Sequence, residues 1–449
     1  MLIGRSRASL IALVGAAVLA ASLPIQSAAA APRRFKGKAP QARVVVAVPD
    51  SATNPYHEFF HAGGPLYKNS KPSSVTPAVL KEFGIKKSNI IELTRTGDFA
   101  KDFAKDKAQF DNIKKGEPYW FKGTNLIGIS FNPEKQRLRP DGSSSAHGVG
   151  TTGAVLGANP DAIVVSVDNT NDESEEWAFT HPAVDIVTTS YGLVTGVPNL
   201  DHLSYSYTGA VKNGKLHFGA ATNDPSLAPF DGTSGPWWSI GIAGFEEGDT
   251  EGRQIMSGNL IDFVGDFTQE LPYCRSCVKG MDFPSGTSFA SPRSAGTMSK
   301  ILLEARRAAG HSGGVVTKGV KVPVMVQGKK ALTNWDLRRA LEEAAYYPSA
   351  TDFQPGAGDG GLFGATSVPV NDAAPWLQTG WGVITPDAKH GVVKEALAHL
   401  GVSSKPERTK GAEICAFMTA QIEARHGYYD NLAASGESFG TTENPYVYC

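Results

Sequence analysis

Five short apolar segments recur along the middle of the chain, and polar stretches of helix-like composition separate several of them. The segments are rich in Val, Ile, Phe and Ala without strict alternation: ARVVVAV (42–48), AIVVSVD (162–168), VDIVTTSYG (184–192), KLHFGAATN (215–223) and WWSIGIAGF (237–245). Strands buried on both faces of a parallel sheet have this composition. The stretches 172–183 and 203–214 favour helices, the second ending at Gly214. This succession predicts an α/β fold, a three-layer sandwich with a mostly parallel central sheet.

Three further helices are expected in the second half of the chain. Good helix formers run from Met298 to Gly310, and the stretch 333–345 opens with a Thr or Asn cap. In the tail, apolar residues recur at helical spacing, which predicts a docked C-terminal helix; they are Ile414, Phe417, Met418 and Ile422. The alternative is a flexible tail.

The first residues predict export from the cell. Arg5 and Arg7 precede an apolar run (10–23), and small residues follow it (27–32), as in a secretory signal peptide. We expect cleavage after about residues 29–31, so that 1–31 is the signal peptide and 32–41 a short N-terminal segment. The run is short for a membrane-spanning helix, although an uncleaved N-terminal anchor is the alternative.

Charge and cysteine content narrow the class of protein further. The chain has 43 Lys and Arg against 44 Asp and Glu and contains no basic block, so we expect no nucleic-acid partner and no membrane partner after cleavage. Four cysteines allow three pairings, of which Cys274–Cys277 with Cys415–Cys449 is the simplest. A redox or zinc half-site at Cys274 and Cys277 is the alternative.

Asp50 and His147 are candidates for chemistry because of their surroundings. Asp50 ends a predicted buried strand, where a side chain would point into the crevice that α/β sheets use as a site. His147 precedes a glycine-dense stretch, HGVGTTGAVLG, which predicts a helix that packs closely, for example against the sheet. Taken singly, each residue could equally serve as a turn or core residue.

Ser288 lies in FPSGTSFASPRSAGT (283–297), at a predicted junction between a loop and a helix. Small neighbours would let a substrate backbone approach its hydroxyl, and a helix N-terminus favours developing negative charge. Pro292 is expected in the first turn, where its missing N–H costs little. A cap on a packed helix is the alternative role for this serine.

Together, Asp50, His147 and Ser288 offer the components of nucleophilic catalysis. A serine hydroxyl becomes a nucleophile when an imidazole takes its proton, and a buried carboxylate can hold that imidazole in the required tautomer. The order Asp, His, Ser along the chain is the one found in subtilisin.

In these motifs the chain resembles the subtilisin-like serine protease (subtilase) family. SGTSFASP resembles the family's serine motif, VVVAVPDS its aspartate motif and, more loosely, AHGVGTTGAVLG its histidine motif. The resemblance implies a subtilisin-like fold over 42–400, with Ser288 as nucleophile, His147 as general base and Asp50 orienting it. It also implies that Asn223 in GAATND helps to bind the oxyanion. Strand addition of a substrate would involve the backbone of the residues that match the SLG segment, Ser190, Tyr191 and Gly192.

The chain departs from the family pattern in several places. Gly150 replaces the second histidine of the histidine motif, and residues 61–140 form an insertion that we interpret as surface loops and helices, with a lid or docking surface as the sharper hypothesis. The loop after the His147 helix is too short for the calcium-holding insertion of many relatives, and no room for a folding propeptide follows the expected cleavage point. Residues 401–449 form a C-terminal extension.

The sequence therefore predicts a secreted, monomeric serine endopeptidase that acts on proteins or peptides and needs no cofactor. Two other functions stay open: a catalytically weak or inactive binding protein with the same fold, and a different acyl hydrolase. The triad order argues against the esterase fold, in which serine comes first.

Overall fold

The computed structural model describes residues 42–134, 137–141, 146–191, 200–221, 223, 233–245, 261–309, 325–327, 330–347 and 374–433. All of them belong to one compact unit of the chain. The predicted signal peptide and segment 32–41 lie outside these residues. Within the described ranges, no helix is both long enough and apolar enough to cross a membrane.

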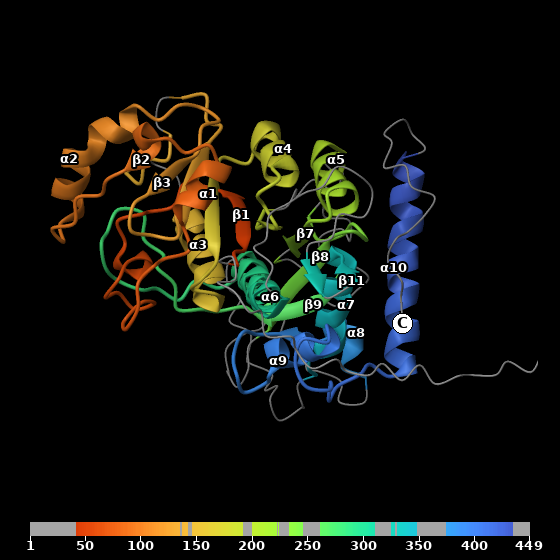
Figure 1. Cartoon of the computed structure of the whole chain (residues 1–449). Helices are drawn as coiled ribbons and strands as arrows, with labels where there is room; N and C mark the ends of the chain where they lie inside the picture. The colour runs from red at the N-terminus through yellow and green to blue at the C-terminus, as the bar shows by residue number, and fades with distance from the viewer. Residues whose placement is uncertain are drawn as a thin grey trace, which may run out of the picture. The chain divides into compact units, whose positions relative to one another are not determined.

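A ten-stranded sheet forms the centre of this unit (Figure 1). Its spatial order is β12-β9-β8-β7-β6-β1-β5-β4-β3-β2. Every neighbouring pair is parallel except β3 and β4, which confirms the predicted mostly parallel sheet. The strands are β1 (Val45–Asp50), β2 (Ile90–Ile91), β3 (Tyr119–Phe121), β4 (Leu126–Ser130), β5 (Ile163–Asp168), β6 (Ile186–Thr189), β7 (Leu216–Ala220), β8 (Ile240–Phe245), β9 (Phe263–Asp266) and β12 (Val383–Ile384). A separate hairpin pairs β10 (Met325–Gln327) with β11 (Lys330–Leu332).

The five predicted apolar segments contain β1, β5, β6, β7 and β8, which are neighbours in the middle of the sheet. Successive residues of β1 enter different clusters: Val46 and Val48 pack in one apolar core, whereas Val45 and Ala47 pack in another. Side chains alternate across a strand, so both faces of the sheet are buried.

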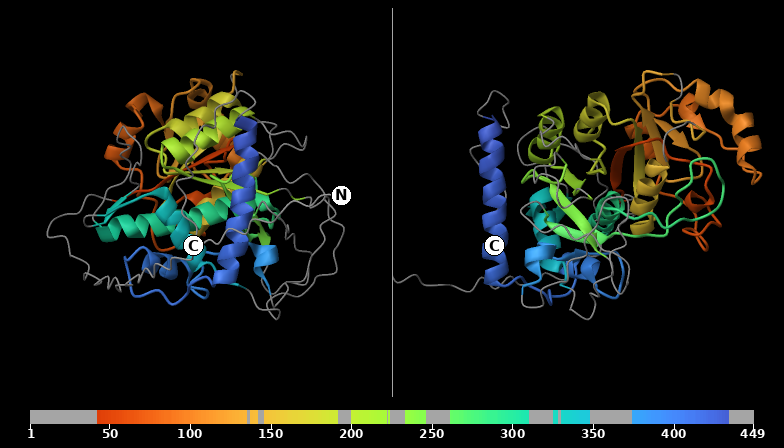
Figure 2. Two further views of the ribbon diagram at one scale, coloured as in Figure 1. Left: turned by 90° about the vertical axis from the view of Figure 1, so that its right-hand side faces the viewer. Right: turned by 180° about the vertical axis from the view of Figure 1, so that it is seen from behind.

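Helices cover both faces of the sheet. In Figure 2, left, α4 and α5 lie on one side of the strands and α6 lies on the other. The helices are α1 (Pro77–Glu82), α2 (Phe99–Asp111), α3 (His147–Ala158), α4 (Asp172–Thr180), α5 (Leu200–Tyr207), α6 (Thr287–Ala309), α7 (Asn334–Ala344), α8 (Trp376–Thr379), α9 (Val392–His399) and α10 (Ala412–Ala433). Short 3-10 helices span Glu58–Phe60 and Lys87–Asn89, and a π-helix, Thr208–Lys212, continues α5.

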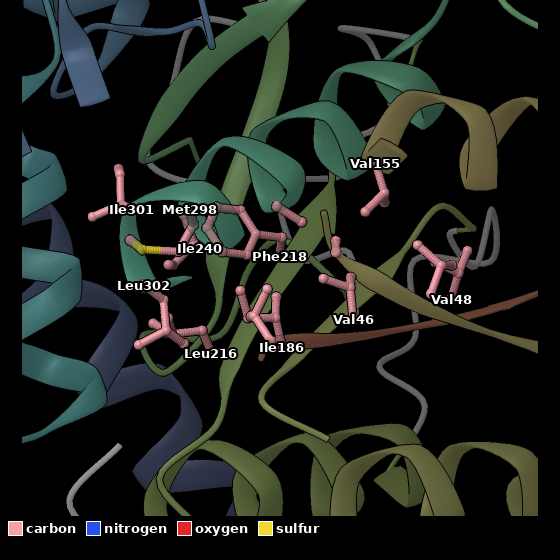
Figure 3. Close-up of a cluster of buried hydrophobic side chains, with 14 of the residues drawn as sticks. Val46, Val48, Val155, Ile186, Leu216, Phe218, Ile240, Met298, Ile301 and Leu302 are labelled. Atoms are coloured by element: carbon pink, nitrogen blue, oxygen red, sulfur yellow. The ribbon is translucent and has the colours of Figure 1, made fainter. Parts of the chain in front are cut away.

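The core between α6 and the sheet fixes the position of this helix (Figure 3). Met298, Ile301 and Leu302 of α6 are fully buried. They share a cluster with side chains from four strands, Val46, Ile186, Leu216, Phe218 and Ile240. Each such apolar side chain contributes about 1.5–3 kcal/mol on burial, so the middle of α6 is firmly placed relative to the strands.

Helix α6 begins at Thr287, which confirms the predicted junction between a loop and a helix beside Ser288. Several of the residues before Met298, among them Ser288, Pro292 and Gly296, are weak helix formers, and burial against the sheet overrides their low propensity. Pro292 therefore lies in the second turn, contrary to the expectation that it occupies the first.

We expected residues 61–140 to form surface loops and helices. They also contain the strands β2, β3 and β4, which extend the central sheet at one edge. The sequence gives no signal for two of them, because β2 has two residues and β3 has three, which is too few to show a period.

The other predicted helices are found close to their expected bounds. A capping box between Thr333 and Asp336 opens α7, and Gly214, with φ of +67°, follows the π-helix at the predicted stop. In α10, Met418 and Ile422 are buried against the rest of the unit, which contradicts the flexible-tail alternative for this helix. Cys449 lies outside the described residues, so its pairing with Cys415 stays a prediction.

Candidate active site

Asp50 is the last residue of β1, at the carboxyl edge of the parallel strands. One carboxylate oxygen, Oδ1, accepts the backbone N–H of Ser51 at 2.6 Å. The other, Oδ2, lies 2.8 Å from Nδ1 of His147 and accepts the hydroxyl of Thr151 at 3.1 Å. The Ser51 hydroxyl also donates to Oδ1, at 3.3 Å, and the Asp50 side chain is only 8% exposed, so this carboxylate is shielded from water and bonded at both oxygens.

His147 opens α3, and a glycine brings that helix against the end of β1. The N–H of Gly148 donates to the hydroxyl of Ser51 at 2.9 Å. A Cβ at Gly148 would stand 1.8 Å from the Ser51 carbonyl oxygen, so a larger residue would push His147 away from Asp50. Close packing of this helix against the sheet edge is confirmed at this glycine.

Two other glycines of α3, Gly150 and Gly153, face the segment around Tyr273 and the start of α6, although we expected them to pack against the sheet. A Cβ at Gly150 would meet the Tyr273 and Phe289 rings at 2.7 and 2.8 Å, and one at Gly153 would meet Pro272 at 2.6 Å. Gly150, which stands where the family has a second histidine, thus makes room for an aromatic pair.

The environment of His147 changes its acidity. Burial on its own lowers the pKa of His147, but the charge of Asp50 and the hydrogen bond to it together outweigh burial and raise the pKa above the usual value for histidine. The ring remains 26% exposed. An Nδ1–H donated to Asp50 leaves Nε2 as the basic atom when the ring is neutral, which is the arrangement a general base needs.

Ser288 is the second residue of α6, and an unusual glycine precedes it. Gly286 has φ of +147°, a conformation that L side chains rarely adopt. The sharp turn places the Ser288 hydroxyl 3.3 Å from the carbonyl oxygen of Ser190, to which it donates. The next ring, Phe289, lies 5.4 Å from that of His147 between centroids. The first turn of α6 and the N-terminus of α3 are therefore neighbours.

Pro292 has a local consequence for this turn. It has no N–H, so it cannot make the usual helical bond to the carbonyl of Ser288 four residues earlier. The Ser190 hydroxyl donates to that carbonyl at 2.8 Å instead. Because of the proline, the Ser288 carbonyl is free to accept a hydrogen bond from Ser190, and this bond joins the end of β6 to α6.

Asn223 lies beside the same turn. Its Oδ1 accepts both the N–H of Thr287 at 2.9 Å and the hydroxyl of Thr287 at 2.8 Å. A Cβ on Gly286 would stand 3.4 Å from its Nδ2. Because Oδ1 is held by Thr287, the amide nitrogen, which can only donate, is oriented by the same contacts.

The residues expected to bind a substrate strand follow β6. Ser190 is tied to Ser288 as described, and the Tyr191 hydroxyl donates to Oε1 of Glu175 on α4. Burial, followed by the negative charge of Glu175, raises the pKa of Tyr191 well above its usual value, so that the phenol stays protonated. Gly192 lies outside the described residues.

The structure adds residues that the sequence analysis missed. Thr151 was not considered, although a position four residues after His147 shares its helix face. Asn54 donates to the carbonyls of both Cys274 and Cys277, at 3.1 and 2.7 Å, and so holds their loop against the chain just after Asp50. No local pattern connects positions 220 residues apart.

The predicted disulfide Cys274–Cys277 is present, so these two sulfurs do not form a zinc half-site, and a redox role for the pair stays a prediction. In the part of the chain that the structure describes, three or more His, Cys, Asp or Glu side chains nowhere gather as metal ligands would.

No protein-family model matches the sequence, and no curated protein matches it either. Among solved structures, the chain is similar to a lanthipeptide protease, with 12% identity and a TM-score of 0.45 over 79% of this chain and 89% of the other. It is similar to the prenylagaramide maturation protease PagA, with 13% identity and a TM-score of 0.44 over 81% and 94%. A cold-adapted subtilisin-like serine proteinase matches with 16% identity and a TM-score of 0.35 over 61% and 80%. With TM-scores below 0.5, these likenesses carry no functional weight here.

Proposed function

We propose that this chain is a serine endopeptidase of the subtilisin-like family, exported from the cell, with Asp50, His147 and Ser288 as its catalytic triad. The single observation that carries the proposal is the 2.8 Å contact between Asp50 and His147 Nδ1, beside the helix N-terminus that bears Ser288. The ring of His147 lies 5.4 Å from that of Phe289, the residue after Ser288, so the buried carboxylate, the partly exposed imidazole and the serine at the helix start lie in one region, as activation of a hydroxyl requires.

In the proposed reaction, the Ser288 oxygen attacks the carbonyl carbon of a peptide bond while its proton passes to Nε2 of His147. Asp50 accepts Nδ1–H and stabilises the imidazolium. The peptide C–N bond then breaks, and the amine leaves with the proton from His147. Water attacks the resulting ester, gives a proton to His147 and releases the acid, which restores the Ser288 hydroxyl.

The negative oxygen of the tetrahedral intermediate would be stabilised by two donors near Ser288. The Asn223 amide is held next to Gly286 and Thr287, and the backbone N–H of Ser288 belongs to the first turn of α6, where unpaired N–H groups and the helix dipole favour negative charge. An extended peptide would pair with the chain at Ser190 and Tyr191.

The test is digestion of a diverse peptide library by the purified mature chain, with Ser288→Ala as the matched control. We expect cleavage products from the wild type only, and their ends would define the residue preference. If the wild type is folded and leaves the library intact, the endopeptidase function is contradicted, and a short-chain ester substrate then separates an acyl hydrolase from a binding protein with this fold. N-terminal sequencing of the exported chain tests secretion, for which we expect a start near residues 30–32.

A further inference from the structure

Three consecutive side chains at the end of β6 are each bound by a different element of the fold. Thr189 Oγ1 lies 2.9 Å from Nε2 of the buried His217 on β7. The Ser190 hydroxyl donates to the Ser288 carbonyl on α6 at 2.8 Å, and the Tyr191 hydroxyl donates to Glu175 on α4. We name residues 189–191 the docking segment. A segment held at every side chain has one conformation and pays little entropy when a substrate strand pairs with it.

Glu175 is the least expected of these partners, because its carboxylate lies inside the protein. The residue is 3% exposed, and its second oxygen, Oε2, lies 2.9 Å from Nδ1 of His202, which is 2% exposed. The ring of Tyr191 lies 6.1 Å from that of His202, edge to face. A buried carboxylate is costly unless its oxygens are bonded, and here one tyrosine and one histidine bond them.

This network connects two helices to the docking segment. Glu175 belongs to α4 and His202 to α5, so their contact also joins the two helices that cover this face of the sheet. A contact that served only to join the helices would not need Tyr191. Tyr191 connects the network to Ser190, which is the next residue along the chain and is bonded to Ser288.

We propose that Glu175 and His202 are positioning residues for the docking segment, and that their network with Tyr191 sets the affinity of the enzyme for extended peptide substrates. The inference rests on the proposed endopeptidase function. Neither Glu175 nor His202 touches the reacting atoms, so they act through Tyr191 on substrate binding and not on the Ser288 nucleophile itself.

The experiment measures two quantities for each variant of the mature chain. One is the KM for an extended peptide, identified from the library digest. The other is the rate at which a small fluorophosphonate labels Ser288, since this reagent has no backbone with which to pair. Glu175→Gln replaces one of the two acceptor oxygens by an NH2 donor, so the side chain can no longer accept from both Tyr191 and His202. Tyr191→Phe removes the phenol donor. Glu176→Gln alters an exposed neighbour on the same helix as the matched control.

For Glu175→Gln we expect KM to rise about tenfold, because a buried donor or acceptor loses its partner, while the labelling rate changes less than about twofold. Tyr191→Phe should raise KM by a similar factor, and the double variant should be little worse than either single one, since both changes disrupt the same network. Glu176→Gln should leave KM unchanged.

Wild-type KM in both single variants, or additive effects in the double variant, would overturn the inference. A labelling rate that falls as much as kcat/KM would also overturn it, because the network would then act on the nucleophile or on the whole fold. If the wild type neither labels nor cleaves, the proposed endopeptidase function itself fails. If the wild type cleaves but the variants keep the wild-type KM, only the inference about Glu175 and His202 fails.

Discussion

Asp50 and Asp262 are both buried carboxylates next to central strands, but their partners differ in whether they can change charge. Asp50 faces His147, whose ring is 26% exposed. Asp262, 0% exposed, lies just before β9 and binds Arg338 of α7 at 2.9 Å and Arg425 of α10 at 2.7 Å. An arginine keeps its proton at any pH the fold survives, whereas a histidine loses it near neutrality.

The comparison separates stability from chemistry. Asp262 joins two helices to the sheet, and it also accepts the N–H of Gly241 in β8, so its contacts are those of a structural centre. Asp50 binds a group that is partly open to solvent and can accept and return a proton. Substitutions around Asp262 should therefore change the stability of the fold, and substitutions around Asp50 should change turnover.

The largest expected effect comes from removing the base or the nucleophile. His147→Ala and Ser288→Ala should each lower kcat by about 10⁶-fold, and the double variant should lose little more, because the residues act as a unit. Peptide hydrolysis measures the loss, and unchanged thermal unfolding shows that the fold is intact. Residual activity in Ser288→Ala near that of the wild type would remove this serine from the mechanism.

The next effect is on stability and belongs to Asp262. Arg425→Ala leaves part of a buried charge without its partner and should lower the free energy of unfolding by about 3–5 kcal/mol. Denaturant titration measures it. The matched control is Lys394→Ala, whose exposed pair with Glu407 should be worth about 0–1 kcal/mol. A folded Arg425→Ala with normal stability but lost turnover would reverse the assigned roles.

Asn223→Ala should have a smaller effect on turnover, about 10²–10³-fold in kcat, because one of two oxyanion donors is lost. KM should change little, since the charge exists only in the transition state. Steady-state kinetics on a peptide separates the two constants. A variant with wild-type kcat would show that Asn223 serves only to cap the turn at Thr287.

The smallest effect is a pair of opposite pH trends in stability. The raised pKa of His147 means that its pair with Asp50 stabilises the fold below the unfolded histidine pKa of about 6.5, and that this contribution is lost as pH rises through the folded pKa. Burial on its own raises the pKa of Asp262, but Arg425 and Arg338 lower it. Its contribution is present above about pH 3.9 and is lost as pH falls further.

Unfolding measured against pH checks both trends. The stability difference between wild type and His147→Ala should shrink as pH rises above neutrality, and the difference between wild type and Arg425→Ala should shrink in acid. The same pH dependence for both differences would contradict the distinction between the two carboxylates.

The same comparison shows what sequence could predict. Asp50 and the middle strands follow from local composition, because a strand buried on both faces has a recognisable pattern and its end marks the site. The contact between Asp262 and Arg425 joins positions 163 residues apart and leaves no local signal. The short strands β2 and β3 leave no local signal either, since two or three residues are too few to show a period.

The central claim is that Asp50 and His147 activate Ser288, and fluorophosphonate labelling of the mature chain, followed by intact mass and peptide mapping, tests it most directly. We predict one label per molecule, on Ser288. The rate should rise as His147 loses its proton, with a midpoint above the usual histidine value of about 6.5, and should fall by up to about 10⁴-fold in Asp50→Asn. A folded wild-type chain that takes no label at any pH between 6 and 9, or one labelled equally well without Asp50, would contradict the claim.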